Sequence, residues 1–530
     1  MANWLKRSIL LVSVGFAIYV EPAVAEQPQS GILKTKDGRS FVYDSVQING
    51  TTYLVKPHGL TPIEIPIADV LCLNQACDAL PARASGLPAS PTGTVSIAGS
   101  NTIGASLMPA LLRKWAESYK DGKVDAKFGQ LDEQALMISR PGSLPLEIEL
   151  AAHGSETGFQ RLLAGTALIG MASRSVKPDE VSALRRKLNV NLLAPDSEHV
   201  IGLDGLAVMV NKANPLKNFG FSTETLAKIF SGEISDWSQI GGKAGTIVIN
   251  ARDDNSGTFS TFKDLVLKPS GKSLSPSAKR FESSDELSEA VAKDDNAIGF
   301  AGLPYVRDNE AVAIGSSCGI TQKPTRFTVQ SEVYPLTRRL YLYTPGAPRN
   351  EAVKAIVDFA TSDAAQAVVR EQGFIDQSIE FEDPQLKTNW LEDLKKQNDP
   401  RVPTKTYAAM IQLAEATRRG SVDFRFNTGS ADLDNKAVHD VARLARVLSG
   451  PDMNGKAWYL VGFADTAGTY AANSDLSVLR AQAVARVLRK IGAKISNDMV
   501  LGFGWLTPVA CNDTEVGRLL NRRVEIWVAR

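Results

Sequence analysis

The sequence predicts a multidomain α/β protein that carries a small β module near its N-terminus. The chain has 530 residues, too many for one ordinary core, because a domain typically holds about 100–200 residues. Strand-like and helix-like segments alternate from Thr94 to Ile375, and a shorter pattern of the same kind runs from Ser421 to Arg530. Such alternation is typical of α/β architecture.

The composition excludes some partners. Apolar residues make up 44% of the chain and charged residues 22%, as in soluble globular proteins. The 59 basic and 58 acidic residues leave a net charge of +1, so no global field attracts nucleic acid or an anionic membrane. We therefore expect no nucleic-acid partner, and any anion site must be local.

Residues 1–25 have the pattern of a secretory signal peptide. Lys6 and Arg7 precede an apolar run, Ile9–Val20, and small residues at Ala23–Ala25 predict cleavage before Glu26. The alternative, a membrane anchor, is disfavoured because the run is too short to span a bilayer in the usual way. We expect an exported, periplasmic protein.

Residues 26–78 predict a small β module. The turn dipeptides Asp37-Gly38 and Asn49-Gly50 bound a strand at residues 40–48, a second strand follows at 51–55, and apolar residues alternate from Ile63. Residues 79–93 are rich in proline and small residues and predict a linker.

The cysteines predict one disulfide. Cys72 and Cys77 are close in sequence, and in an oxidising compartment they are expected to pair. Cys318 and Cys511 stand alone in different predicted domains, so we expect two buried, unpaired thiols. The histidines and cysteines lack zinc-site spacing, and we expect neither a metal nor a cofactor.

Residues 94–375 contain three copies of one local design, in which a strand leads through a tight polar turn into a helix. The turns are Gly99–Thr102, Gly154–Thr157 and Arg252–Thr258. A helix start has unpaired N–H groups and a partial positive charge, and therefore attracts oxyanions. For any single turn, ordinary helix capping is the simpler interpretation. Three such turns together with an arginine predict an anion site.

This middle domain resembles the periplasmic phosphate-binding component of ABC transporters, which has a type 2 periplasmic binding fold. The resemblance rests on Arg252 with Ser256-Gly257-Thr258, on the two other turns, on Ile169–Arg174 and on a late helix from Ala352 to Glu371. It implies two lobes with inorganic phosphate or a similar oxyanion buried between them, no enzymatic activity, and an inner-membrane ABC permease as partner. The residues it places on the phosphate are Thr102, Ser155, Arg252, Ser256, Gly257 and Thr258.

One position departs from the family pattern. Well-known members carry an aspartate where this chain has Arg174. That carboxylate accepts a hydrogen bond from protonated phosphate and so discriminates against sulfate, which has no proton to donate. An arginine cannot accept. Either Arg174 binds the anion directly and loosens the discrimination, or it is a structural residue with a salt-bridge partner.

Residues 376–420 predict a polar connector with some helix, and residues 421–530 predict a second α/β domain. Its first helix carries Val438, Val441, Ala442, Ala445 and Leu448 on one face, which we expect to be buried. The domain resembles the OmpA-like peptidoglycan-binding domain through residues 462–468, Asn473, Leu476-Ser477, Arg480-Ala481 and residues 521–525.

This second resemblance implies binding of the peptidoglycan stem peptide through its diaminopimelate residue. Asp465 would take the ammonium group and Arg480 a carboxylate, with Asn473 ordering the loop between them and Arg523 lining the same pocket. The alternatives are a turn cap for Asp465 and a solvated helix face for Arg480. Many family members carry a His-Thr type pair before the aspartate, whereas this chain has Phe463-Ala464.

Two functions from different classes follow. In the first, the protein captures phosphate for uptake while held non-covalently to peptidoglycan, in the periplasm or in association with the outer membrane. In the second, it is an envelope-organising or phosphate-sensing protein without a transport role. A phosphatase that uses Ser256 is disfavoured, because no general base has a plausible spacing to that serine.

Overall fold

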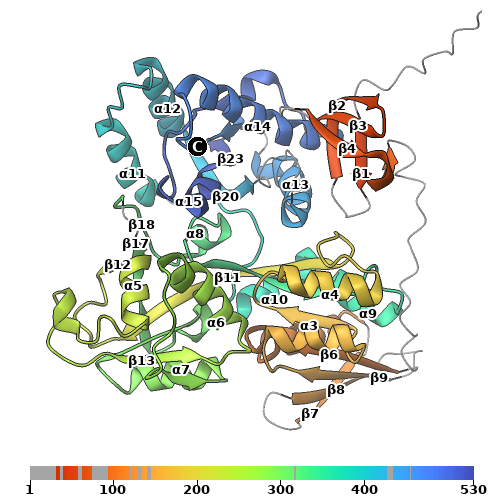
Figure 1. Cartoon of the computed structure of the whole chain (residues 1–530), viewed down its shortest axis with the longest axis vertical. Coiled ribbons are helices and arrows are strands. Elements are labelled where there is room, and N and C mark those ends of the chain that lie inside the picture. Colours follow the sequence, from red (N-terminus) through yellow and green to blue (C-terminus); the bar gives the residue numbers. More distant parts are fainter. Residues whose placement is uncertain are drawn as a thin grey trace, which may run out of the picture.

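The computed structural model describes residues 31–35, 40–57, 62–73, 93–119, 122–128, 133–139, 145–315, 318–382, 384–425, 434–453 and 455–530. The predicted signal peptide lies outside these residues. So does Cys77, and with it the predicted Cys72–Cys77 disulfide. Figure 1 shows the two large bodies one above the other, with the N-terminal sheet at the side of the upper one.

The N-terminal module is one antiparallel sheet, as expected for a small β module. Its strand order is β4-β3-β2-β1-β5. Leu33, Val46, Val55 and Ile65 form its small core. The strands are β1 (Gly31–Thr35), β2 (Ser40–Asn49), β3 (Thr52–Pro57), β4 (Ile63–Pro66) and β5 (Val70–Leu73).

The middle domain is built on an 11-stranded mixed sheet in the order β14-β13-β15-β11-β19-β10-β6-β9-β8-β7, with β16 also paired to β11. The strands are β6 (Thr94–Gly99), β7 (Lys123–Phe128), β8 (Glu133–Ser139), β9 (Leu146–Ala151), β10 (Ile169–Ala172), β11 (Glu198–Asn211), β13 (Val248–Arg252), β14 (Lys279–Phe281), β15 (Ala297–Gly302), β16 (Asn309–Ala311) and β19 (Thr337–Tyr343). A separate small sheet has the order β12 (Gly220–Ser222), β17 (Ala313–Gly315), β18 (Thr321–Gln322).

This domain has two lobes, one on each side of the point at which β11 changes its partner strand. We call the lobe that contains Ile97 and Leu111 lobe 1, and the lobe that contains Phe230 and Phe300 lobe 2. Strand β11 belongs to both: its first half pairs with β19 and its second half with β15. The pair β11–β19 therefore joins the lobes, and the expected two-lobed α/β fold is confirmed.

The helices of lobe 1 are α1 (Asn101–Gly104), α2 (Leu107–Glu117), α3 (Ser155–Ala164), α4 (Pro178–Leu188), α9 (Glu351–Ala360) and α10 (Asp363–Glu371), and those of lobe 2 are α5 (Thr223–Phe230), α6 (Gly257–Phe262), α7 (Ser284–Ala292) and α8 (Arg326–Gln330). The single late helix predicted from Ala352 to Glu371 is wrong. It is two helices, because Ser362 accepts a hydrogen bond from Ala365 N and caps a new one.

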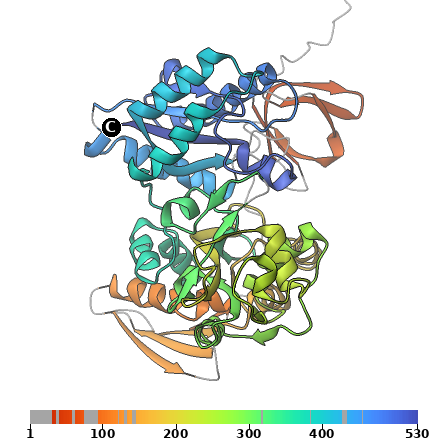
Figure 2. The ribbon, with the colours of Figure 1, turned by 90° about the vertical axis from the view of Figure 1, so that its left-hand side faces the viewer.

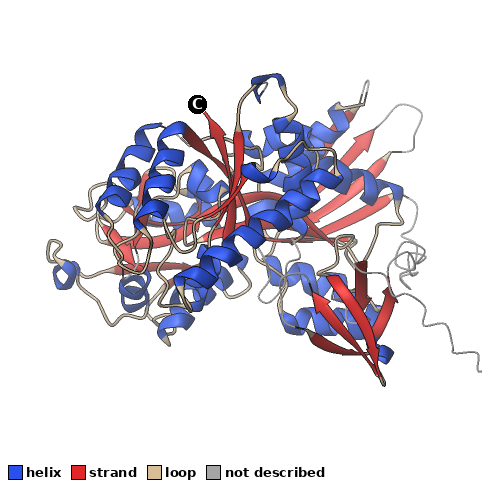
Figure 3. Ribbon diagram, turned by 90° about the horizontal axis from the view of Figure 1, so that it is seen from above, coloured by secondary structure: helices blue, strands red, loops and turns tan. Residues whose placement is uncertain are grey.

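The connector forms α11 (Pro384–Lys396) and α12 (Thr404–Ala416), which pack against each other and against the C-terminal domain. That domain has a four-stranded sheet in the order β20 (Thr417–Arg425), β23 (Arg523–Ala529), β21 (Trp458–Gly462), β22 (Val500–Gly502). Its helices are α13 (Asn435–Leu448), α14 (Tyr470–Lys490) and α15 (Glu515–Asn521). Figure 1 labels α14, a helix of 21 residues, in the upper body, and Figure 3 shows the molecule from above with helices and strands in different colours.

The predicted inner face of α13 is partly wrong. Val441 is buried, but Val438 is 54% exposed and Ala442 is exposed as well. The helix is rotated so that Lys436, Asp440 and Arg443 are buried instead. These charges satisfy one another, since Asp440 pairs with both Lys436 at 2.6 Å and Arg443 at 3.0 Å.

A disulfide joins the two large bodies. Cys318 of lobe 2 is bonded to Cys511 of the C-terminal domain, with their Cα atoms 5.7 Å apart. The prediction of two unpaired thiols is therefore wrong. The two residues are 193 positions apart and belong to different domains, so their sequence spacing carries no pairing signal.

The C-terminal domain contacts both lobes. On lobe 1, Asn435 Nδ2 donates to Leu193 O at 3.2 Å, and Arg446 pairs with Asp363 at 2.9 Å. On the side of lobe 2, Arg425 donates to the carbonyls of Ser331 and Glu332 at 3.1 and 3.0 Å. Figure 2 shows the narrow region where the two bodies meet.

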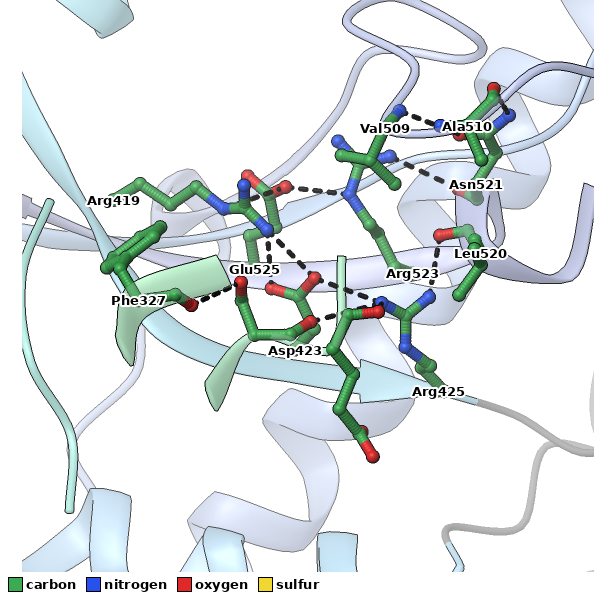
Figure 4. Close-up of polar contacts among 12 residues, drawn as sticks. Phe327, Arg419, Asp423, Arg425, Val509, Ala510, Leu520, Asn521, Arg523 and Glu525 are labelled. Atoms are coloured by element: carbon green, nitrogen blue, oxygen red, sulfur yellow. Dashed lines mark hydrogen bonds and ion pairs between the residues drawn. The ribbon is translucent and has the colours of Figure 1, made fainter. Parts of the chain in front are cut away.

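A buried charge network supports this junction from inside the C-terminal sheet (Figure 4). Asp423 accepts from Arg419 at 2.8 Å and lies 3.5 Å from Arg425, while Glu525 accepts from Arg523 at 2.7 Å. Paired charges of this kind tolerate burial, whereas a single one is costly. Within the described residues, no helix combines the length and apolar character needed to cross a membrane.

We expect Cys318→Ser and Cys511→Ser each to lower the free energy of unfolding by about 2–4 kcal/mol, because the cross-link restricts the unfolded chain. The two changes break the same bond, so the double variant should lose no more than either single variant. Denaturant unfolding of all three variants measures this. Additive losses would mean that the sulfur atoms are not bonded to each other.

Candidate functional site

The structure brings the three polar turns together between the lobes. Thr102 of α1 and Thr258 of α6 approach each other, with their hydroxyl oxygens 3.3 Å apart. Gly257 faces the second turn, Gly154–Thr157, since a Cβ built on it would lie 2.1 Å from Ser155 Oγ. Only glycine allows this close approach. Residues from lobe 1 and lobe 2 thus form one polar cluster.

At the centre of this cluster lies a residue that the sequence analysis missed. Arg338 of β19 donates to the Thr258 hydroxyl at 2.7 Å. It also lies 3.4 Å from the hydroxyls of both Thr102 and Ser173. One buried guanidinium therefore reaches hydroxyls from both lobes. We call Arg338, Thr102, Ser173 and Thr258 the lobe-junction cluster.

Asp204 holds Arg338 in place. The two residues are direct cross-strand partners in β11 and β19. Asp204 Oδ2 accepts from Arg338 Nε at 3.0 Å and Nη2 at 2.6 Å, and Oδ1 accepts from Leu303 N at 2.9 Å. Burial raises the pKa of this carboxyl, and the charge of Arg338 opposes that rise. A Cβ on Gly302 would lie 2.4 Å from Asp204 Oδ2, so glycine makes room for the pair.

Strand alternation explains why two neighbouring arginines have different tasks. Successive side chains of a strand point to opposite faces. Arg338 points into the lobe-junction cluster, whereas Arg339 pairs with Glu332 at 2.7 Å and with Asp434 at 2.8 Å. Asp434 caps α13, so Arg339 contacts the C-terminal domain. The sequence signal was a pair of charged residues within an otherwise apolar strand.

Arg252, the arginine expected to bind the anion, lies beside the cluster. Its Nε donates to Phe281 O at 3.2 Å, its Nη1 donates to Ser284 Oγ at 2.5 Å, and its Nη2 contacts Glu282 O. Nη2 also lies 3.4 Å from Asn101 Oδ1, across the lobe boundary. Arg252 therefore joins the lobes next to Thr102.

Ser155 and Ser256 serve mainly as local hydrogen-bond acceptors. Ser155 Oγ accepts from Ser173 N at 3.0 Å. Ser256 caps α6 and accepts from Thr258 N at 3.2 Å and from Phe259 N at 3.4 Å. These contacts fix the two turns that carry Gly257 and Ser173.

Arg174 forms a salt bridge with Glu180, in agreement with the second interpretation above, that of a structural residue. Its guanidinium binds both oxygens of Glu180, at 2.6 and 2.8 Å, and lies over the ring of Phe159. Glu180 also accepts from Lys177 N at the start of α4. The bidentate pair fixes the entry into α4.

A histidine bridges the lobes at the edge of the site. His153 Nε2 lies 3.1 Å from Glu133 of lobe 1, and Nδ1 lies 3.1 Å from Glu282, which precedes α7 of lobe 2. Burial lowers the pKa of His153, but the hydrogen bonds and charges of Glu282 and Glu133 outweigh it and raise that pKa overall. The protonated ring thus links two carboxylates on opposite lobes.

The C-terminal domain holds a second charged cluster, formed by Asp465, Arg480 and Arg522. Asp465 follows β21 and pairs with Arg522 at 2.8 Å, and its other oxygen accepts from Ala467 N at 2.8 Å. Arg480 of α14 donates one long hydrogen bond, to Phe463 O at 3.4 Å. Burial and the neighbouring Arg522 lower the pKa of Arg480 to about 10, which Asp465 partly offsets. We call these three residues the charged triad.

Asn473 and Arg523, the other two residues predicted to bind peptidoglycan, lie in different surroundings. Asn473 donates to Ala467 O at 2.6 Å and to Thr469 O at 3.2 Å, so it holds the loop between Asp465 and α14. Arg523 is 1% exposed and is bound by Glu525 and by Thr507 O. It lies in the buried network of Figure 4 rather than on the surface. Arg522, its neighbour, is the arginine that reaches Asp465.

The structure combines a two-lobed α/β domain with a C-terminal α/β domain that carries the charged triad. The sequence model of the PBP superfamily domain matches residues 88–364. The model of the OmpA family matches residues 425–522. The chain belongs to the PBP superfamily, and it carries a C-terminal OmpA family domain.

Individual relatives resemble the middle domain. The phosphate-binding protein PstS of Borreliella burgdorferi is 28% identical over 250 residues, which cover 46% of this chain and 85% of that protein. PstS of Bacillus subtilis is 27% identical over 287 residues, which cover 54% and 83%. The solved structure of PstS from Borrelia burgdorferi is 25% identical with a TM-score of 0.35, covering 54% of this chain and 98% of that one.

We expect His153→Gln to destabilise the protein more at pH 5.5 than at pH 8.5. Because the folded-state pKa is raised above its usual value of 6.5, protonation stabilises the fold. This contribution is complete below that value and is lost as the pH rises through the raised one. The groups are partly exposed, so the difference should stay below about 1 kcal/mol. Thermal unfolding of both proteins at the two pH values measures it, and a difference that grows with pH would contradict the bridge.

Proposed function

We propose that the protein binds phosphate, or a similar tetrahedral oxyanion, between its two lobes for uptake through an inner-membrane ABC permease. One observation carries the proposal: the buried Arg338 is shared by hydroxyls from both lobes. A guanidinium and surrounding hydroxyls are suitable donors for an oxyanion, and charge-assisted hydrogen bonds of this kind are strong. The names of the curated relatives support the choice of phosphate.

A binding role fits Ser256 better than a catalytic one. Its hydroxyl accepts two backbone N–H groups as a helix cap, an arrangement that positions the turn. A nucleophilic serine needs a general base within hydrogen-bond reach. A bound metal ion could activate the serine instead, but the described residues contain no group of side chains suited to hold one.

We further propose that the C-terminal domain holds the protein non-covalently to peptidoglycan in the periplasm. Arg480 is the supporting observation, because its guanidinium has no carboxylate partner at salt-bridge distance among the described residues and lies near a second arginine. A ligand carboxylate would relieve this unfavourable placement. Asp465 supplies the opposite charge for the ammonium group of diaminopimelate.

A second candidate function, phosphate sensing at the wall, is favoured by the junction between the bodies. The C-terminal domain is bonded to lobe 2 through Cys318–Cys511 and pairs with lobe 1 through Arg446–Asp363. A change in the angle between the lobes would therefore strain the wall-binding domain. Coupling of this kind must be reciprocal.

We expect Arg338→Ala to weaken phosphate binding by about 10- to 100-fold or more, the cost of losing hydrogen bonds to a charged group. Arg174→Ala should bind phosphate like the wild type, because Arg174 is paired with Glu180. Calorimetric titration of the full chain measures both. The assignment fails if Arg338→Ala remains folded and binds phosphate normally, or if wild-type protein binds no oxyanion.

We expect Asp465→Ala and Arg480→Ala to lose co-sedimentation with purified sacculi, while Asp475→Ala, on the exposed side of the same helix, retains it. Retention by both triad variants would refute the proposed wall site.

The same co-sedimentation assay, repeated with saturating phosphate, separates uptake from sensing. Unchanged sedimentation favours uptake, whereas a phosphate-dependent change favours sensing.

A further inference from the structure

A hollow of about 410 Å³ lies between the connector and the C-terminal domain. Its volume is within the range of ligand sites, about 300–1,000 Å³. One wall is the loop between α11 and α12 together with the start of α12, and the other consists of loops that follow β21 and β22. Its polar lining includes Gln397, Asn398, Arg401, Tyr407, Thr466 and Asn512.

The domain wall of this hollow is continuous with the charged triad. Thr466 follows Asp465, and its N–H donates to Asn512 Oδ1 at 3.3 Å. Asn521, next to Arg522, donates to the same oxygen at 3.0 Å. Cys511, in the disulfide, precedes Asn512. A ligand bound at the triad would therefore extend into the hollow with little distance to cross.

The connector wall is held in a defined position. Asp399 N donates to the Tyr407 hydroxyl at 3.0 Å, which ties the loop to α12. Arg401 lies over the ring of Trp505, 4.8 Å from its centroid, and pairs with Asp399 at 2.7 Å. The connector residues lie outside the part of the chain that the OmpA family matches, residues 425–522.

The chemistry of the lining fits a peptide. Gln397, Asn398 and Asn512 offer amide donors and acceptors, which match backbone N–H and C=O groups. The Arg401 side chain is 63% exposed. Its Nε and Nη2 bind both oxygens of Asp399, and the exposed guanidinium has further N–H groups that can donate to a ligand carboxylate.

We propose that this hollow binds the part of the peptidoglycan stem peptide that adjoins its diaminopimelate residue. The inference rests on the proposed wall binding and deepens it. The triad would take the charged end of the diaminopimelate side chain, and the hollow would take the neighbouring peptide groups and a carboxylate. The protein would thus recognise a stem peptide more tightly than diaminopimelate alone.

Calorimetry on the full chain tests this with three probes: free diaminopimelate, a stem peptide that contains it, and the wall disaccharide without peptide. We expect the stem peptide to bind about tenfold more tightly than free diaminopimelate, the effect of one or two added hydrogen bonds. Arg401→Ala and Gln397→Ala should remove most of this gain and leave diaminopimelate binding unchanged. Lys405→Ala, which removes a positive charge from the same connector outside the lining, is the matched control.

The possible failures are distinguishable. If wild-type protein binds diaminopimelate and the stem peptide equally, or if the connector variants weaken both equally, the inference is wrong while wall binding stands. If the disaccharide binds and the connector variants abolish that binding, the hollow is a sugar site and the inference is also wrong. If neither peptide probe binds, the proposed wall function fails and the inference fails with it.

Discussion

The site between the lobes depends on the salt bridge between Asp204 and Arg338. The two residues face each other across β11 and β19, the strands that belong to both lobes. An arginine buried there without a partner would be costly, and Asp204 makes its burial possible. Held in this way, Arg338 is placed to reach Thr102 and Ser173 on one lobe and Thr258 on the other.

The pairing also sets the charge of the site. Both oxygens of Asp204 are occupied, one by Arg338 and the other by Leu303 N. The hydroxyls of the lobe-junction cluster are donors that need no charge of their own. A bound oxyanion would therefore accept hydrogen bonds from these hydroxyls. The charge of the Arg338 guanidinium beside them would be partly balanced by Asp204. Arg174 is occupied by Glu180, and as an arginine it offers no hydrogen-bond acceptor.

The C-terminal domain is built on the same principle of paired and unpaired charge. In its core, Asp423 and Glu525 are matched by Arg419, Arg425 and Arg523 (Figure 4). The half-buried Arg480 has no such match among the described residues. Matched charges stabilise the junction with the lobes, and the unmatched one is suited to an external ligand.

Much of this could be predicted from sequence, because alternating strands and helices, turn residues and polar loop motifs are local signals. The turns that carry Thr102, Ser155 and Thr258 were recognised in this way. Arg338 was missed because its role comes from its cross-strand neighbour Asp204, which is 134 residues away. The Cys318–Cys511 disulfide and the rotation of α13 were missed for a similar reason. Both depend on contacts between domains, which periodicity within one segment does not report.

The most direct test of the central claim is a crystal structure of the full chain grown with phosphate. We expect one phosphate within hydrogen-bond distance of the Arg338 guanidinium and of the Thr102 and Thr258 hydroxyls, with Asp204 still bound to Arg338. A phosphate bound elsewhere, with Arg338 and these hydroxyls contacting only protein atoms, would contradict it.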